Sequence, residues 1–176
     1  MKNLSIKEPK PYTQNEEVTG KVEETVSPLY KRGGLGHALA LLGIQQADSL
    51  LDAPTDFDMV EVIRKGLSKK AMDEMMAHMN ITSLEMSRML HTSDRTMPRY
   101  TSESVLNPEQ SERLIELARL FAHGVDVFGS AERFRRWMSG PVYSLGGQQP
   151  IDLMDTSIGI SLVNDTLGRI EYGIVG

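Results

Sequence analysis

Cysteine is absent from this sequence of 176 residues, which excludes a disulfide-stapled scaffold, a thiolate zinc site and a cysteine nucleophile. Aromatic residues are also scarce, at 6%. No apolar run is long enough to span a bilayer, since the longest, around residues 35–44, is about half the required length. Residues 1–15 lack the apolar core of a secretory signal peptide. We therefore expect a cytoplasmic protein that has no contact with a membrane.

An excess of positive charge is missing as well. The net charge is −5, and residues 105–176 carry nine acidic residues against six arginines. One short stretch, residues 86–102, reverses this balance with three arginines and a single acid. The three arginines are Arg88, Arg95 and Arg99. Because an acidic average field repels phosphate, we expect any nucleic-acid contact to be short and confined to this stretch.

Groups that could perform catalysis are few and scattered. The four histidines are His37, His78, His91 and His123. They lie in separate segments, and none has a carboxylate at a metal-ligand spacing. Asp152 and Asp155 are three residues apart, but turn-forming and helix-capping roles explain both. Gly146-Gly147 lacks the preceding strand and the third glycine of a phosphate loop. We therefore expect no enzyme, no bound metal and no cofactor.

The sequence does contain helical periodicity, beginning after a polar N-terminal segment. Residues 1–30 are rich in Lys, Glu, Thr and Pro and cannot bury enough apolar surface to offset chain entropy, so we predict a flexible arm. After a predicted hinge at residues 33–34, a short apolar helix within residues 35–42 should pack against another element or another chain. No alternation typical of strands follows. The predicted fold class is all-α.

Capping residues mark where the later helices should start. The predicted caps are Ser68, Thr82, Asn107, Ser130 and either Asp155 or Thr156. A preceding helix is predicted from the spacing of Phe57, Val60, Ile63 and Leu67. The longest helix should bury Leu114, Leu117, Ala118, Phe121, Val125 and Phe128. Helical spacing also favours core filling, over an adaptable binding surface, for Met72, Met75, Met76, Met79, Met86 and Met89.

Residues 67–104 have the layout of a helix-turn-helix: a helix, a tightly capped second helix, a four-residue turn and a third helix. Arg95, Thr96 and Arg99 would lie on one face of that third helix and enter the major groove of DNA. Pro98 falls inside the third helix, where it removes a backbone hydrogen bond and should shorten or redirect the reading face. From the pattern alone, a generic three-helix bundle with surface arginines is an equal alternative.

The chain closes on an apolar, glycine-flanked segment, Gly173-Ile174-Val175-Gly176. Chain ends are usually polar and frayed. We expect this end to be buried in another protein, because two β-branched side chains beside glycines suit a narrow pocket. The alternative is that Ile174 and Val175 dock on the protein's own last helix.

Four motifs near the end of the chain occur in a distinctive order. They are Arg136-Trp137-Met138, the run PVYSLGG at residues 141–147, QPIDLMDT at residues 149–156 and LGRIEYG at residues 167–173. In this order they resemble the Xre/MbcA/ParS antitoxin family. The resemblance extends over residues 60–176. Thr96 and Arg99 occupy the places of the family's Thr and Arg in the third helix, whereas Pro98 departs from the usual polar residue there.

The resemblance implies an Xre-like helix-turn-helix joined to a small helical toxin-binding domain. The cognate toxin would be of the RES-domain group, which consumes NAD or uses it to ADP-ribosylate a target. The implied partners are this toxin, operator DNA and a second antitoxin copy, as a homodimer within a larger toxin–antitoxin complex. The implied DNA-binding residues are Arg95, Thr96 and Arg99. The expected toxin-binding residues are Arg169, Glu171, Tyr172, Gly173, Ile174, Val175 and Gly176.

We accordingly divide the chain into three parts. Residues 1–55 form an N-terminal extension with a short helix and a possible role in dimerisation, residues 56–104 the DNA-binding domain, and residues 105–176 the toxin-binding domain. The predicted function is neutralisation of the toxin by occlusion of its active site, together with autoregulation of the operon. The alternative is a stand-alone helix-turn-helix repressor whose C-terminal domain only mediates oligomerisation.

Overall fold

The computed structural model describes residues 34–44, 55–93, 95 and 97–174. In these ranges all regular structure is helical apart from two isolated β-bridges, Ser68–Val105 and Val142–Gln148, so the predicted all-α class is confirmed. The helices are α1 (Leu35–Leu41), α2 (Asp56–Lys65), α3 (Lys69–Met79), α4 (Ser83–Met89), η3 (Met97–Arg99), α5 (Pro108–Phe128), α6 (Ala131–Met138), η4 (Tyr143–Leu145), α7 (Pro150–Leu153) and α8 (Ser157–Glu171). The predicted arm of residues 1–30 lies outside the described residues.

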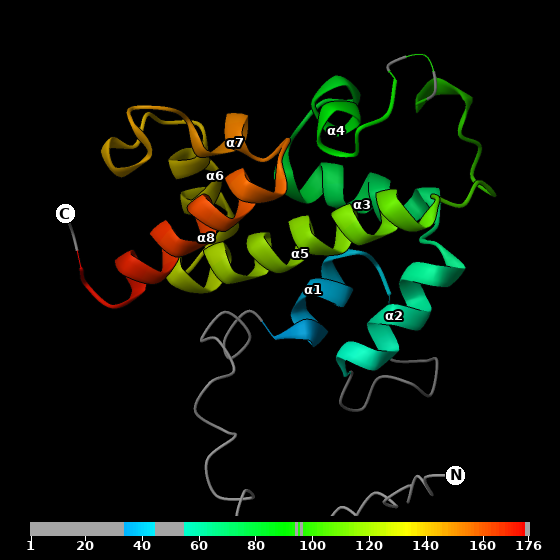
Figure 1. The fold of residues 1–176 in the computed structure, drawn as a ribbon, viewed down its shortest axis with the longest axis horizontal. Coiled ribbons are helices and arrows are strands. Elements are labelled where there is room, and N and C mark those ends of the chain that lie inside the picture. Colours follow the sequence, from blue (N-terminus) through cyan, green and yellow to red (C-terminus); the bar gives the residue numbers. More distant parts are fainter. Residues whose placement is uncertain (1–33, 45–54, 94, 96, 175–176) are drawn as a thin grey trace, which may run out of the picture.

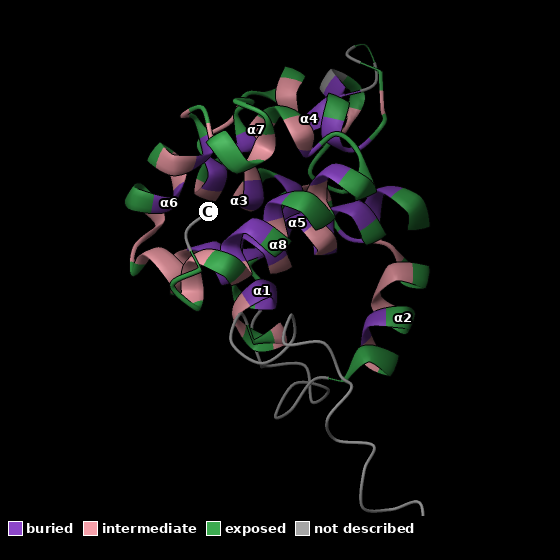
Figure 2. Ribbon diagram, turned by 60° about the vertical axis from the view of Figure 1, so that its left-hand side comes forward, coloured by how far each residue is buried: buried purple, intermediate pink, exposed green. Residues whose placement is uncertain are grey.

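Helix α5 is the axis around which the other helices pack (Figure 1). It starts as predicted, with Pro108 in its first turn and a reciprocal capping box between Asn107 and Gln110. Helices α1, α2, α3, α6 and α8 all contact it. Much of α5 is buried (Figure 2). The buried residues include the polar Arg113 and His123, whereas Val125 and Phe128 of the predicted stripe are half-buried.

The methionines fill the core, as predicted. Met72, Met75, Met79, Met86 and Met89 are buried, and Met76 is half-buried. They join the same cluster as Leu114, Phe121, Phe134, Met138 and Leu167, which come from the other half of the chain. Flexible thioether side chains suit this irregular space between helices that cross at different angles. The core is therefore continuous from α1 to α8.

Helix α2 is rotated relative to the prediction. Phe57 and Val60 were expected to face inward, but Phe57 is 86% exposed and Val60 is also exposed. Met59 is buried instead, and an ion pair of 2.6 Å between Asp56 and Arg119 fixes the start of α2 on α5. The helix also ends before Leu67, because Gly66 adopts a positive φ of 84° that does not continue the helix.

None of the helices in the described ranges is both long and apolar enough to cross a membrane. Two short elements near the C-terminal motifs, η4 and α7, were not predicted. They are too short to show a helical period in the sequence.

Candidate functional site

The first two helices of the predicted helix-turn-helix are formed as expected. The Ser68 side chain caps α3, Asn80 ends it in a left-handed conformation, and Thr82 and Glu85 form a capping box at α4. The Thr82 amide and hydroxyl both donate to the Glu85 carboxylate at 2.7 Å. These hydrogen bonds lower the pKa of Glu85, because they stabilise its charged form.

The predicted third helix is reduced to one 3₁₀ turn, η3, within the described residues of this segment. This corrects the expectation of a longer helix that carries Arg95, Thr96 and Arg99. Pro98 explains the shortening of this helix in two ways. Pro98 has no backbone N–H to donate, and a residue that precedes proline, here Met97, is disfavoured in the α conformation. The predicted shortening by Pro98 agrees with this geometry.

The segment that contains η3 is nevertheless anchored to the body of the protein. Met97 is buried, and the Tyr100 hydroxyl donates to Gln110 of α5 at 3.0 Å. Behind η3, the Lys69 amide donates to the Ser104 carbonyl at 2.9 Å. The loop that joins α4 to α5 is therefore held by hydrogen bonds to the starts of α3 and α5.

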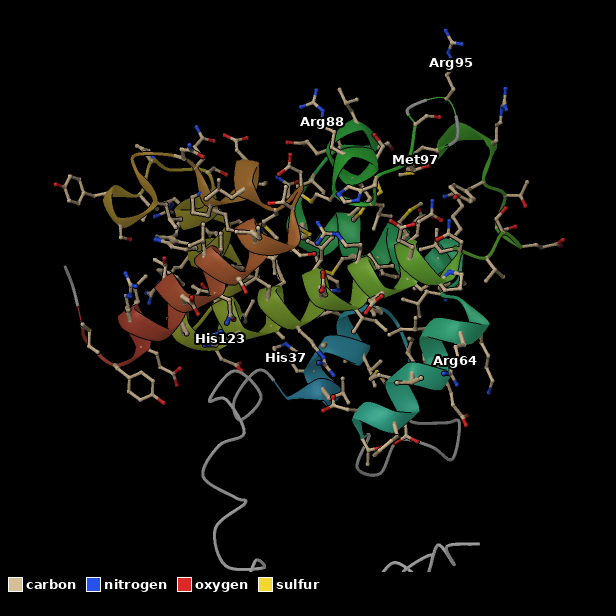
Figure 3. The ribbon with its side chains drawn as sticks, viewed as in Figure 1. His37, Arg64, Arg88, Arg95, Met97 and His123 are labelled. Carbon is tan, nitrogen blue, oxygen red and sulfur yellow. The ribbon has the colours of Figure 1, made fainter. Side chains whose placement is uncertain are left out.

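The arginines of this loop point away from the core. Arg95 and Arg99 are exposed, and Arg95 extends into solvent from the same edge as Arg88 of α4 (Figure 3). Arg88 lies beside Glu85, Asp152 and Asp155 in a shallow depression between α4 and α7, where acidic neighbours weaken its field. Thr96 lies outside the described residues. Arg95 and Arg99 are therefore the described cations best placed to meet a phosphate or a base.

The predicted toxin-binding residues lie at the opposite end of the molecule, where α8 ends (Figure 1). The Gly173 amide donates to the Ile170 carbonyl at 3.0 Å, and the Ile174 amide donates to the Arg169 carbonyl at 2.8 Å. Together with the φ of 67° at Gly173, this pair of hydrogen bonds is a Schellman motif. The glycine is thus explained by helix termination, and the motif fixes the direction in which the chain leaves α8.

The side chains at this end differ in exposure. Arg169 and Tyr172 are exposed, and Ile174 is 63% exposed, so Ile174 is not docked on α8. Glu171 is turned inward instead, with its carboxylate 3.3 Å from Nε2 of the buried His123. Val175 and Gly176 lie outside the described residues.

His123 joins α5 to the last two turns of α8. Its Nδ1 lies 2.9 Å from the Asn164 side-chain oxygen, and its Nε2 contacts Glu171. Asn164 and Glu171 are seven residues apart on α8, so the imidazole spans two turns on one side of that helix. This geometry gives His123 a role in seating the helix that carries the tail.

Helix α8 is also seated at its start. Thr156 provides the cap, one of the two predicted candidates. At Gly159 a β-carbon would overlap the Leu153 carbonyl oxygen, so only glycine allows α8 to approach α7 this closely.

A buried guanidinium connects this region to the helix-turn-helix. Arg113 donates to the Met89 carbonyl at the end of α4 and to the Met154 carbonyl before α8, at 3.2 and 3.1 Å. His91, just after α4, places Nε2 at 2.6 Å from the Asp155 carbonyl. Sequence reasoning missed Arg113, although a charged residue within the apolar stripe of a helix is a signal that could have identified it.

In the described ranges, no group of three or more His, Asp or Glu side chains is arranged to hold a metal ion. The exposed arginine loop and the end of α8 are the two regions in which the sequence placed candidate binding residues.

Comparisons with known proteins match two domains along the chain. Residues 58–119 match the antitoxin Xre-like helix-turn-helix domain, and residues 123–173 match the antitoxin Xre/MbcA/ParS C-terminal toxin-binding domain. The chain is 31% identical over 118 residues to the antitoxin Xre of Yersinia enterocolitica, a match that covers 66% of this chain and 80% of that protein.

Two further relatives are similar over comparable lengths. The Prs ADP-ribosylating antitoxin of a Sphingobium species is 29% identical over 126 residues, which are 66% of this chain and 79% of that protein. The antitoxin Xre of Pseudomonas putida is 27% identical over 129 residues, which are 71% of this chain and 80% of that protein. With two matched domains in the same order and a relative matched over four fifths of its length, this chain belongs to the Xre/MbcA/ParS family of antitoxins.

Proposed function

We propose that this antitoxin neutralises a RES-domain toxin by inserting the end of α8 and the following residues into the toxin's active site. The observation that carries the proposal is the exposed apolar end, where Tyr172 and Ile174 face solvent beyond a fully capped helix. Burial of Ile174 and Val175 in a cleft would contribute about 1.5–3 kcal/mol each. The proposed toxin-binding residues are Arg169, Glu171, Tyr172, Gly173, Ile174, Val175 and Gly176.

The charges at this end suit a cleft that binds NAD. A toxin that consumes NAD, or transfers its ADP-ribose, needs cations for the pyrophosphate. Glu171 would pair with such a cation in a charge-assisted hydrogen bond. The name of the Sphingobium relative refers to ADP-ribosylation, which supports a toxin of this chemistry.

We also propose that residues 56–104 bind operator DNA through Arg95, Thr96 and Arg99, and that the toxin–antitoxin complex represses its own operon. The exposed arginines and the anchored loop support this function. The antitoxin would act by binding alone, without catalysis, in the cytoplasm and as a homodimer within the complex. Because η3 is a single turn, we expect base readout to depend on few contacts and phosphate contacts to dominate affinity.

The test separates the two surfaces with two variants of the full chain. One variant ends after Gly173, which removes the apolar tail and retains Glu171 beside His123. The other is the double substitution Arg95→Ala, Arg99→Ala. Each is co-expressed with the product of the neighbouring reading frame and scored for cell growth, and each is purified for operator binding at several salt concentrations.

We expect the shortened protein to stay folded and to lose neutralisation, while its operator binding persists. The double arginine variant should neutralise normally, and the slope of log affinity against log salt should fall by about 2 per protomer. Full neutralisation by the shortened protein would contradict occlusion by the tail. A stand-alone repressor would instead bind the operator tightly without the toxin. It would also have no effect on the toxicity of the product of the neighbouring reading frame.

A further inference from the structure

Helix α8 carries a second exposed surface that the tail does not explain. Ile158, Leu162, Asp165, Arg169 and Tyr172 follow each other at intervals of three or four residues, so they lie in one line along the helix. We call this line the α8 stripe. It is about 21 Å long at 1.5 Å per residue. All five of its residues are exposed.

The apolar members of the α8 stripe are unusual because the helix already has a complete buried face. Val163 and Leu167 on the opposite side are fully buried and seat α8 on α5. Ile158 is 76% exposed and Leu162 is 48% exposed, one turn apart. Exposed green segments therefore run along the outer side of α8 (Figure 2). Scattered apolar residues on a surface are ordinary, but two on consecutive turns of one line form a continuous patch.

We propose that the α8 stripe binds the toxin's surface beside its active site, so that the antitoxin is held by a helix face as well as by the tail. The inference rests on the proposed function, because it names a further part of the same interface. Ile158 and Leu162 would pack against an apolar patch on the toxin, and Arg169 would pair with an acidic group at the rim of the toxin's cleft.

Continuity favours the toxin as the occupant of this surface. Arg169 and Tyr172 belong both to the α8 stripe and to the proposed tail interface, and the whole of α8 lies in the region that matches the toxin-binding domain. The Schellman motif at Gly173 joins the stripe to the tail without a flexible link.

The size of the surface disfavours a second antitoxin copy. A strip 21 Å long and about 10 Å wide offers on the order of 200 Å², whereas a stable dimer needs about 800 Å² from each partner. The α8 stripe can contribute to a stable interface only as one part of a larger contact area, such as the one that begins at the tail. A pair of antitoxins joined through it would also cover Tyr172 and compete with the toxin.

The test measures affinity of the full-length antitoxin for the purified product of the neighbouring reading frame, by titration calorimetry at fixed salt. Ile158→Ala and Leu162→Ala remove apolar surface and keep good helix propensity. The free energy of burying each side chain against the toxin is taken in proportion to its exposed fraction in the free antitoxin. On this basis, toxin binding should weaken about twentyfold for Ile158→Ala and about sevenfold for Leu162→Ala. Leu84→Ala is the matched control, because Leu84 is a helical leucine 44% exposed on α4, outside the proposed interface.

Weaker toxin binding by both α8 variants, with unchanged binding by Leu84→Ala and an unchanged oligomeric state in light scattering, would support the inference. Changes below twofold would overturn it. Dissociation of an antitoxin dimer with toxin affinity retained would also overturn it and would identify a second copy as the occupant. The protein that ends after Gly173 separates the two proposals: if it neutralises fully while the α8 variants bind weakly, occlusion by the tail is wrong and the α8 stripe stands.

Discussion

The substitution Arg113→Met should break the connection between the helix-turn-helix and the toxin-binding region. Arg113 is buried, and its guanidinium donates to the Met89 and Met154 carbonyls, to the Ser157 hydroxyl and to the Glu116 carboxylate, at 3.0–3.2 Å. Methionine has a similar length and fills most of the same volume. The change therefore removes charge and donors rather than packing.

The expected loss of stability follows from the buried carbonyl groups that lose their hydrogen-bond donor. Each buried carbonyl that loses its charged donor costs about 1–3 kcal/mol, so the Met89 and Met154 carbonyls together cost about 2–6 kcal/mol. Methionine carries no charge to desolvate, and this offsets part of the loss. We expect a net decrease of about 3 kcal/mol in the free energy of unfolding, or about 6–12 °C in Tm for a chain of this length.

Urea denaturation followed by circular dichroism measures this change. Arg136→Met is the matched control, because Arg136 is exposed and pairs at 3.1 Å with the exposed Glu132 one turn away on α6, a contact worth about 0.5 kcal/mol or less. Arg113→Lys should give an intermediate loss, since it keeps the charge without the forked donors. If Arg113→Met destabilises the protein no more than Arg136→Met, the guanidinium does not hold the two regions together.

Two further changes test the seating of α8 and the cap of α4. Gly159→Ala should destabilise the protein by about 3 kcal/mol or more in urea denaturation, because its methyl group would overlap the Leu153 carbonyl, whereas Gly168→Ala on the same helix has open space and should be neutral or stabilising by up to about 1 kcal/mol. Equal effects of the two glycine substitutions would refute the close approach. Thr82→Ala should cost about 1 kcal/mol at neutral pH. Because the pKa of Glu85 is lowered below 4.5 in the folded protein, the stability it provides is complete above pH 4.5 and is lost as the pH falls through its folded pKa. The difference between wild type and Thr82→Ala should therefore narrow in acid, and a constant difference from neutral to acidic pH would contradict this assignment.

The features predicted best from the sequence are those that depend on a few adjacent residues. The caps at Ser68, Thr82, Asn107 and Thr156 are found where their local patterns place them, because a side-chain oxygen and an amide three residues later need no distant partner. The all-α class and the methionine core follow from spacing in the same way.

Features that depend on tertiary packing were predicted poorly. Helix α2 contacts α5 with Met59 buried and Phe57 exposed, and this orientation depends on contacts between segments far apart in the sequence. The carbonyl partners of Arg113 and the partners of His123 could not be predicted locally either, since they lie more than twenty residues away. At the candidate site, the sequence indicated the arginine loop and the apolar end, but it could not indicate that Glu171 turns inward.

The central position of α5 has a consequence for the exchange of parts between related antitoxins. The two matched domains end and begin at residues 119 and 123, within one uninterrupted helix. A chimera joined there would keep that helix but would bring together Leu114 and Phe121 from one parent with Phe134 and Leu167 from another. Partner specificity can therefore be transferred to another antitoxin only when the recipient's half of α5 already packs against the donor's core residues. We expect related antitoxins to diverge through paired substitutions, one in each half of this shared core.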